Sequence, residues 1–318
     1  MQNTLELKTK PESKFRKEMR NFKKNKSIVW FLVPAMLLVA FFGYLPMFGI
    51  LFAFKEQVTP NNWFYDLLTS KYTFQHIAAI AQEDVLIALK NTLIISLSKL
   101  VIFFPLTILF AILLAEIKRP KISKFILFVM CLPNFLSWPV TIGIWDNLVG
   151  YNGLITTSLL KIGLIDSQVS LFASSFKFMV VFLTVWKGLG WGSIFFYSAI
   201  MSIDKEYYEA ATIDGANKIQ KIRYLTIPGI LPVIALQLVL NITYILDAGF
   251  DQVYSMLELV KQDTYDQQIL GTFIFNEAMT KTNLSFGVAM GVINGTLALL
   301  LMLFGNKLVK KRLGTSLW

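Results

Sequence analysis

The chain has 318 residues, of which 55% are hydrophobic and 16% are charged. This composition is typical of an integral membrane protein and argues against a soluble enzyme. The formal net charge is +10, but the Lys and Arg residues cluster at the ends of apolar runs. That placement suits contact with membrane lipid and argues against the basic stripe of a nucleic-acid-binding domain.

Six stretches are long and apolar enough to cross a bilayer, which takes about 20 residues in a helix. They are 28–54, 91–114, 123–145, 176–200, 225–246 and 284–306. Each is expected to be a helix, because lipid offers no partners to an unpaired backbone. We therefore predict an all-α, polytopic bundle of six transmembrane helices over 28–306, with polar tails at 1–27 and 307–318. The first run is too long for a signal-peptide core and is expected to be retained.

The Lys and Arg residues also predict the orientation of the bundle. Residues 1–27 contain nine, and 115–124, 201–224 and 307–318 contain four each. The remaining connections contain six in all, namely Lys55, Lys71, Lys90, Lys161, Lys261 and Lys281. Because basic residues favour the cytoplasmic side, both termini and the connection 201–224 are expected to be cytoplasmic.

The sequence offers no catalytic or metal-binding constellation. The one cysteine, Cys131, lies in an apolar run and is expected to be a small buried hydrophobe. The one histidine, His76, lies in a polar connection and is expected to be solvated or locally bonded. A membrane-embedded enzyme would need paired reactive groups, and there is no phosphate-binding G-x-x-x-x-G-K-[ST] loop. We expect a non-enzyme that contains no cofactor of its own.

The connection after the fourth span has a more regular sequence pattern than a simple linker between two membrane helices requires. Residues 206–213 contain no helix breaker, Gly215 can form a turn, and 217–224 can begin a second short helix. Ala210 and Ala211 would allow a close approach of another backbone, and Glu209 offers an acceptor. The residues alone support two interpretations equally, insertion into a groove of a soluble partner and a helix resting on lipid.

This connection resembles the cytoplasmic coupling loop of ABC-importer permeases. The family pattern is EAA, three residues, G, nine residues and I-x-L-P. The chain has Glu209-Ala210-Ala211, Gly215 and then LTIP at 225–228, with Leu for Ile and Ile for Leu as the departures. The resemblance implies that a coupling loop at 202–224 docks on a separate ATPase. The implied coupling residues are Glu209, Ala210, Ala211, Asp214 and Gly215.

Other stretches are similar to a narrower group. "LPNFLSWPVTIGIW" (132–145), "WKGLGW" (186–191) and "GFDQVYSM" (249–256) resemble polysaccharide-type sugar permeases of low-GC Gram-positive bacteria. Over 25–312 this resemblance implies a type I importer core, like that of the maltose-importer permeases, in the bacterial plasma membrane. The implied partners are a second, homologous permease, two ABC ATPase subunits that bind ATP and Mg, an extracellular substrate-binding lipoprotein and a carbohydrate, including uronate-containing oligosaccharides. The segments 55–90 and 247–283 would face the lipoprotein, and the charged stretch 261–269 is expected to be solvated.

In similar permeases the substrate path is formed by the helices on either side of the coupling loop. The candidates before the loop are Lys187, Gly188 and Trp191, and those after it are Gln237, Asn241, Tyr244 and Asp247. The second set falls on one face of a continuous helix. Two interpretations remain for these polar groups, contact with substrate and hydrogen bonding between helices. Lys187 is expected either to pair with Asp247 or to meet an anionic sugar. The sequence does not decide whether Lys99 faces a seam between subunits.

Two further classes of membrane protein are weighed against an importer subunit. A secondary transporter commonly contains inverted repeats, and no convincing repeat relates 28–145 to 176–306. A non-transporting scaffold is separated from a permease by copurification with an ATPase and by ATP-dependent uptake.

Overall fold

A computed structural model describes residues 26–165, 170–260 and 267–314. The regular secondary structure of the described residues consists of helices and one isolated bridge between Lys55 and Tyr72. Three predicted segments lie wholly or partly outside the described residues. They are most of the N-terminal tail (1–25), most of the charged stretch 261–269 (261–266) and the end of the C-terminal tail (315–318). The chain divides into two units, 1–51 and 52–318.

The first unit contains the first predicted span. Helix α2 (Lys26–Val39) leads into η1 (Ala40–Tyr44), and η2 (Leu45–Phe54) continues past the end of the unit. The helical run Trp30–Phe54 is 25 residues long and apolar enough to cross a membrane. This agrees with the predicted span at 28–54.

Four further helices of the described chain meet the same requirements of length and composition. They are α5 (Glu83–Ala115), α10 (Phe176–Met201), the run Lys218–Thr243 and α16 (Leu284–Leu313). The run Lys218–Thr243 joins α12 (Lys218–Lys221), η5 (Ile222–Thr226) and α13 (Ile227–Thr243). The described chain therefore has five continuous candidate spans, or six with one broken helix pair, and the all-helical membrane bundle is confirmed.

The third span is not the continuous helix predicted at 123–145. Helix α6 (Pro120–Cys131) and η4 (Leu132–Phe135) end at an extended Leu136, and α7 (Trp138–Val149) and α8 (Leu154–Lys161) follow after a bend of 99°. Pro139 explains the break, because in an unbroken helix its ring would clash with the carbonyl of Phe135. In the first turn of α7 the same proline is tolerated.

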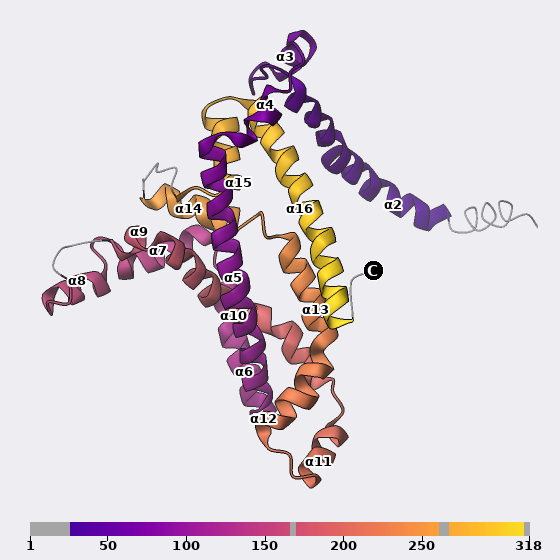
Figure 1. Cartoon of the computed structure of the whole chain (residues 1–318), viewed down its shortest axis with the longest axis vertical. Helices are drawn as coiled ribbons and strands as arrows, with labels where there is room; N and C mark the ends of the chain where they lie inside the picture. Colours follow the sequence, from indigo (N-terminus) through magenta and orange to yellow (C-terminus); the bar gives the residue numbers. More distant parts are fainter. Residues whose placement is uncertain (1–25, 166–169, 261–266, 315–318) are drawn as a thin grey trace, which may run out of the picture. The chain divides into compact units, whose positions relative to one another are not determined.

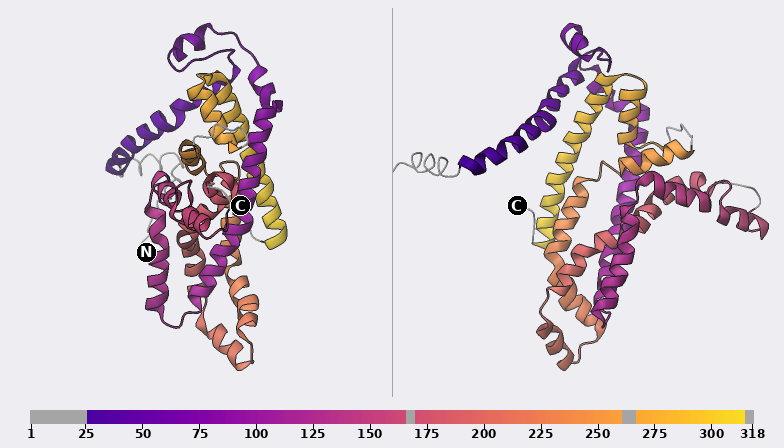
Figure 2. Two further views of the ribbon diagram at one scale, coloured as in Figure 1. Left: turned by 90° about the vertical axis from the view of Figure 1, so that its left-hand side faces the viewer. Right: turned by 180° about the vertical axis from the view of Figure 1, so that it is seen from behind.

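Helix α10 is the central element of the second unit, and it packs against α5, α6 and α13. Figure 2 shows α5 and α10 side by side from further directions. Small residues permit this close packing. A Cβ on Gly190 would meet the backbone oxygen of Met130 at 2.3 Å, and a Cβ on Gly192 would meet Thr107 at 2.9 Å. Cys131 is buried nearby, as predicted.

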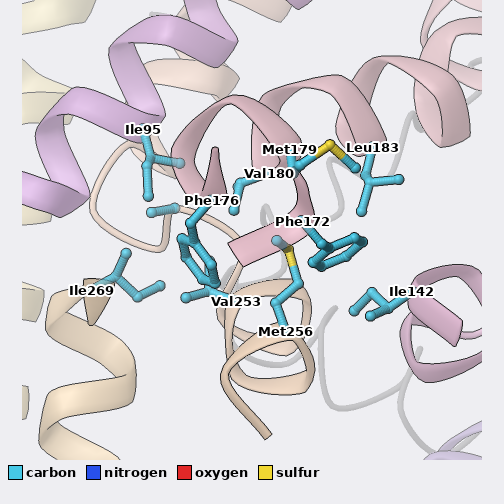
Figure 3. Close-up of a cluster of buried hydrophobic side chains, with 11 residues drawn as sticks. Ile95, Ile142, Phe172, Phe176, Met179, Val180, Leu183, Val253, Met256 and Ile269 are labelled. Carbon is cyan, nitrogen blue, oxygen red and sulfur yellow. The ribbon is translucent and has the colours of Figure 1, made fainter. Parts of the chain in front are cut away.

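An apolar cluster joins the short helices to the spans. It contains Ile95 of α5, Ile142 of α7, Phe172 of α9 (Leu171–Ser174), Phe176 of α10 and Met256 of α14 (Phe250–Val260). Figure 3 shows these side chains converging. Because all five are at most 3% exposed, burial of apolar surface fixes α7, α9 and α14 against the membrane helices.

The connection between η2 and α5 forms a small folded cap. It contains α3 (Trp63–Thr69), α4 (Gln75–Ala78) and η3 (Ala79–Ala81). His76 Nε2 lies 2.9 Å from Glu56 O, so the predicted local bonding of His76 is confirmed. The amide of Leu284, at the start of α16, donates to Val58 O. Before α16 the chain forms α15 (Leu270–Phe275) and η7 (Asn276–Thr280).

The contact between α10 and α6 predicts the effect of adding one methyl group. Replacing Gly190 by Ala should lower the free energy of unfolding in mixed micelles by about 1–3 kcal/mol, because the Cβ would overlap backbone that cannot move aside easily. The matched control is Gly291→Ala in α16, where a Cβ meets nothing within 4 Å, so the change should be neutral or slightly stabilising. Equal stabilities of the two variants would contradict the tight contact.

Candidate functional site

A cavity of ≈ 380 Å³ lies where the predicted substrate-path helices meet. Its lining combines aromatic rings, side-chain amides and one cation. The residues are Phe103, Phe104, Thr107, Asn134, Trp138, Thr184, Lys187, Gly188, Trp191, Gly192, Phe195, Phe196, Gln237 and Asn241. This lining contains no Asp or Glu among the described residues, so its only formal charge is the ammonium of Lys187.

Lys187 extends from α10 toward the broken third span. Its side chain is 9% exposed, and Nζ donates a hydrogen bond to Asn134 O at 3.0 Å. The same nitrogen lies 4.9 Å from the centroid of the Trp138 ring, within the range of a cation–π interaction. In the described part of the chain, no carboxylate forms an ion pair with Lys187.

The predicted pair between Lys187 and Asp247 is therefore wrong. Helix α13 ends at Thr243, and Tyr244 begins a turn with φ −91° and ψ 11°. Tyr244 is 67% exposed and Asp247 is exposed too, so neither lines the cavity. The prediction that both continue one helical face fails because the helix ends before reaching them.

The other five path candidates are brought together by the fold. Lys187, Gly188 and Trp191 come from α10, and Gln237 and Asn241 come from α13. Asn241 Nδ2 donates to Gln237 O at 2.7 Å, which orients its amide along the helix. Gly188 allows the Phe103 ring of α5 to pack closely against α10, since a Cβ on Gly188 would meet that ring at 3.0 Å. These contacts are compatible with both earlier interpretations of the polar groups.

Sequence reasoning missed Asn134 and Trp138, which position the cation. Both belong to "LPNFLSWP", whose polar and aromatic residues interrupt an apolar run between two prolines. That break was the available signal, because irregular backbone within a membrane span is tolerated where protein covers it or where it lines a cavity. Asn134 O becomes the acceptor of Lys187 because η4 ends at Phe135.

Segment 202–224, the predicted coupling loop, begins with a well-capped helix. Helix α11 (Lys205–Ile213) starts at Asp204, whose carboxylate accepts from the amide of Glu206 at 3.1 Å. At its other end Gly215 has φ +76°. The amides of Gly215 and Ala216 donate to the carbonyls of Thr212 and Ala211, which is the Schellman arrangement that glycine favours. The predicted helix and turn are confirmed.

The expected second short helix is instead the beginning of the fifth span. Asn217 and Gln220 form a reciprocal capping box at the start of α12, and the helix runs on through η5 into α13. Two contacts tie α11 to it: Tyr208 Oη lies 2.9 Å from Thr226 Oγ1, and Lys221 Nζ donates to Thr212 Oγ1 at 2.7 Å. A short separate helix was expected because Pro228 was assumed to begin a new one.

The outer face of α11 is available for a partner. Glu209, Ala210, Asp214 and Gly215 are exposed, and Ala211 is half-buried. Ile213 is 87% exposed. A large apolar side chain beside small residues and carboxylates can enter a groove on another protein.

Comparison with known proteins assigns the family. Residues 104–315 match the family described as "Binding-protein-dependent transport system inner membrane component". The chain is 29% identical over 283 residues to the polygalacturonan/rhamnogalacturonan transport system permease protein YteP of Bacillus subtilis (strain 168), covering 88% of this chain and 86% of that protein. It is also 29% identical over 296 residues to Protein LplB of the same organism, covering 92% and 91%.

Solved structures show the same architecture. A chain of a bacterial ABC transporter involved in the import of the acidic polysaccharide alginate matches with a TM-score of 0.82 and 28% identity, covering 93% of this chain and 99% of that chain. A second match, with a TM-score of 0.81 and 27% identity, comes from the alginate ABC transporter in complex with an alginate pentasaccharide-bound periplasmic protein, and it covers 94% of this chain and 99% of that chain. The family match extends over most of the helices that surround the cavity and includes the whole of segment 202–224. This chain therefore belongs to the binding-protein-dependent transport system inner membrane components and is a permease subunit of an ABC importer.

Proposed function

We propose that this permease carries acidic oligosaccharides through the cavity around Lys187. The observation that carries the proposal is a buried ammonium in a cavity whose described lining has aromatic and amide groups and no carboxylate. Among the relatives, alginate is described as an acidic polysaccharide, and the polygalacturonan that names the first Bacillus subtilis permease is built from galacturonate. A uronate carboxylate is the natural partner of such a cation.

The geometry of Lys187 leaves capacity for this partner. An ammonium has three hydrogens, and Asn134 O accepts one. The remaining donors can form charge-assisted hydrogen bonds with a carboxylate. A buried cation without an opposite charge is unfavourable, so a uronate entering the cavity would gain this interaction and relieve that cost.

The other lining residues suit the rest of a sugar. Trp138 and Trp191 present ring faces to the apolar side of a pyranose. Gln237 and Asn241 offer amides that both donate and accept hydrogen bonds with hydroxyls. Gly188 lets the Phe103 ring pack closely against α10 as part of the cavity wall.

Segment 202–224 is proposed to be the cytoplasmic coupling loop, with both chain termini and the tails 1–27 and 307–318 on the same side. Glu209, Ala210, Ala211, Asp214 and Gly215 would dock on one of two ABC ATPase subunits, which bind ATP and Mg. A second, homologous permease would complete the path, and an extracellular lipoprotein would deliver the sugar to the opposite face in the bacterial plasma membrane.

The fold gives the coupling loop a direct connection to the cavity. Tyr208 and Lys221 hold α11 to the start of the helix Lys218–Thr243. From Lys221 that helix reaches Gln237 without a break, over about 24 Å at 1.5 Å per residue. A displacement of α11 by an ATPase would therefore move one wall of the cavity as a rigid element.

Replacing Lys187 by Met should remove the preference for acidic cargo. In proteoliposomes with the partner permease, the ATPase and the lipoprotein receptor, uptake of a uronate oligosaccharide should fall about 10–100-fold, because charge-assisted hydrogen bonds are lost. Uptake of a neutral oligosaccharide of equal length should change little. The matched control is Lys177→Met, which removes a half-buried lysine at the start of the same helix, outside the cavity. Equal losses for both sugars would contradict the role given to the ammonium.

Replacing Gly215 by Ala should uncouple ATP hydrolysis from uptake. A side chain at φ +76° costs about 1–2 kcal/mol, and relief of this strain would displace the end of α11. Gly163→Ala is the control, because Gly163 has φ +70° after α8, far from the loop in the sequence. Uptake per ATP hydrolysed should fall several-fold only for Gly215→Ala. Equal coupling ratios in the two variants would remove segment 202–224 from its proposed role.

A further inference from the structure

A second lysine, Lys99, lies in a hydrogen-bonded network that joins three helices. Lys99 Nζ donates to Ala248 O at 2.8 Å and to Gln252 Oε1 at 2.9 Å. Thr184 Oγ1 lies 2.9 Å from the same Gln252 oxygen, and Gln252 Nε2 donates to Val180 O at 2.7 Å. Gln252 is fully buried, and its side-chain amide contacts α5 through Lys99 and α10 through Thr184 and Val180.

This network adjoins the cavity on the α5 and α10 walls. On α5 the cavity lining begins at Phe103, four residues after Lys99. On α10 it begins at Thr184, which belongs to both the network and the lining. On α13 it reaches Asn241, and the chain then turns into α14, which contains Gln252. One turn of helix is about 5.4 Å, so the network borders the end of the cavity remote from segment 202–224.

The turn at Ala248 and Gly249, just before α14, has a strained backbone and packs closely against Lys99. Ala248 has φ +49° and Gly249 has φ +81°, and a non-glycine residue in this region is unfavourable. A Cβ on Gly249 would lie 2.8 Å from Lys99 Nζ. The hydrogen bond from Lys99 to Ala248 O therefore helps to hold a backbone conformation that the residue would otherwise avoid.

We propose that Lys99 is a positioning residue that fastens the first turn of α14 over the outer mouth of the cavity, so that Lys99, Thr184 and Gln252 form an outer gate. The inference rests on the proposed function, since transport requires the outer end of the cavity to open when the receptor delivers its sugar. Opening separates α14 from α5 and α10, and it must break the hydrogen bonds of Gln252. The charge on Lys99 raises the free energy needed to open the gate, because hydrogen bonds from a charged donor are stronger than neutral ones.

The test uses the complete importer in proteoliposomes. Lys99→Met keeps the length of the side chain and removes its donors, which should shift the gate toward the open state about tenfold. The proposed coupling loop links the helices to the ATPase pair, so a bundle that opens more readily on the outer side should favour the closed, hydrolysing pair. ATP hydrolysis without receptor should therefore rise by a similar factor, and stimulation by loaded receptor should shrink. A purely structural loss would lower both activities instead.

A second variant keeps the proposal testable if Lys99→Met does not assemble. Thr184→Val removes a hydroxyl that contacts Gln252 Oε1 and also bonds Val180 O of its own helix, and loss of the contact with Gln252 should raise receptor-independent hydrolysis about threefold. Its matched control is Thr243→Val, whose hydroxyl bonds the backbone of its own helix, at Val239 O, and which should match the wild type. Wild-type hydrolysis in both Thr184→Val and any assembled Lys99→Met complex would overturn the gate.

A direct readout of opening is thiol access to the cavity. In a Cys131→Ala background, Phe195→Cys places one thiol in the cavity lining, and an impermeant maleimide is added on the receptor side. Labelling should be about tenfold faster with Lys99→Met than with Lys99 intact, and equal rates would overturn the gate. If loaded receptor does not stimulate the wild type at all, the proposed function fails, and the gate fails with it.

Discussion

Every backbone amide and carbonyl in a membrane span needs a partner from the protein, and this constraint shapes the whole chain. It produces long helices such as α5 and α10. It also limits where the backbone can be irregular. Two helix breaks in the described second unit lie next to the cavity. One is at Leu136, and the other is the turn after Thr243. The first interruption packs against α10. In the second, Leu246 and Ala248 are buried, whereas Tyr244 and Asp247 are exposed.

Two cations use this arrangement in different ways. Lys187 extends into the cavity with one carbonyl and one aromatic ring as neighbours, so part of its hydrogen-bonding capacity remains for cargo. Lys99 has two oxygen acceptors on the α14 side of the chain, so its ammonium binds protein to protein. Lys187 is therefore suited to the proposed recognition of cargo, and Lys99 is suited to keeping the proposed gate closed. The difference arises because a backbone break faces one lysine and a buried amide faces the other.

The proposed coupling loop and the cavity are joined by one continuous helix, which a turn then connects to the proposed gate. Segment 202–224 is fastened to the start of the fifth span by Tyr208 and Lys221. That span carries Gln237 and Asn241 to the cavity and then leads into α14. Movement at one end can therefore reach the other through few flexible points. Packed helices respond by shifting as units, since their side chains interlock.

The sequence by itself determined five of the spans and the glycine turn at Gly215, because these depend on hydropathy and on the backbone freedom of one residue. The expectation that residues of α10 and α13 meet at one path came from the family resemblance. Only the tertiary structure decided that α13 stops before Tyr244, that the third span bends, and which acceptor each lysine meets. Lys99 and Gln252 are 153 positions apart, and Lys187 and Asn134 are 53 apart. Such partners are chosen by how helices pack, and helical periodicity within one segment contains no information about the residues of another.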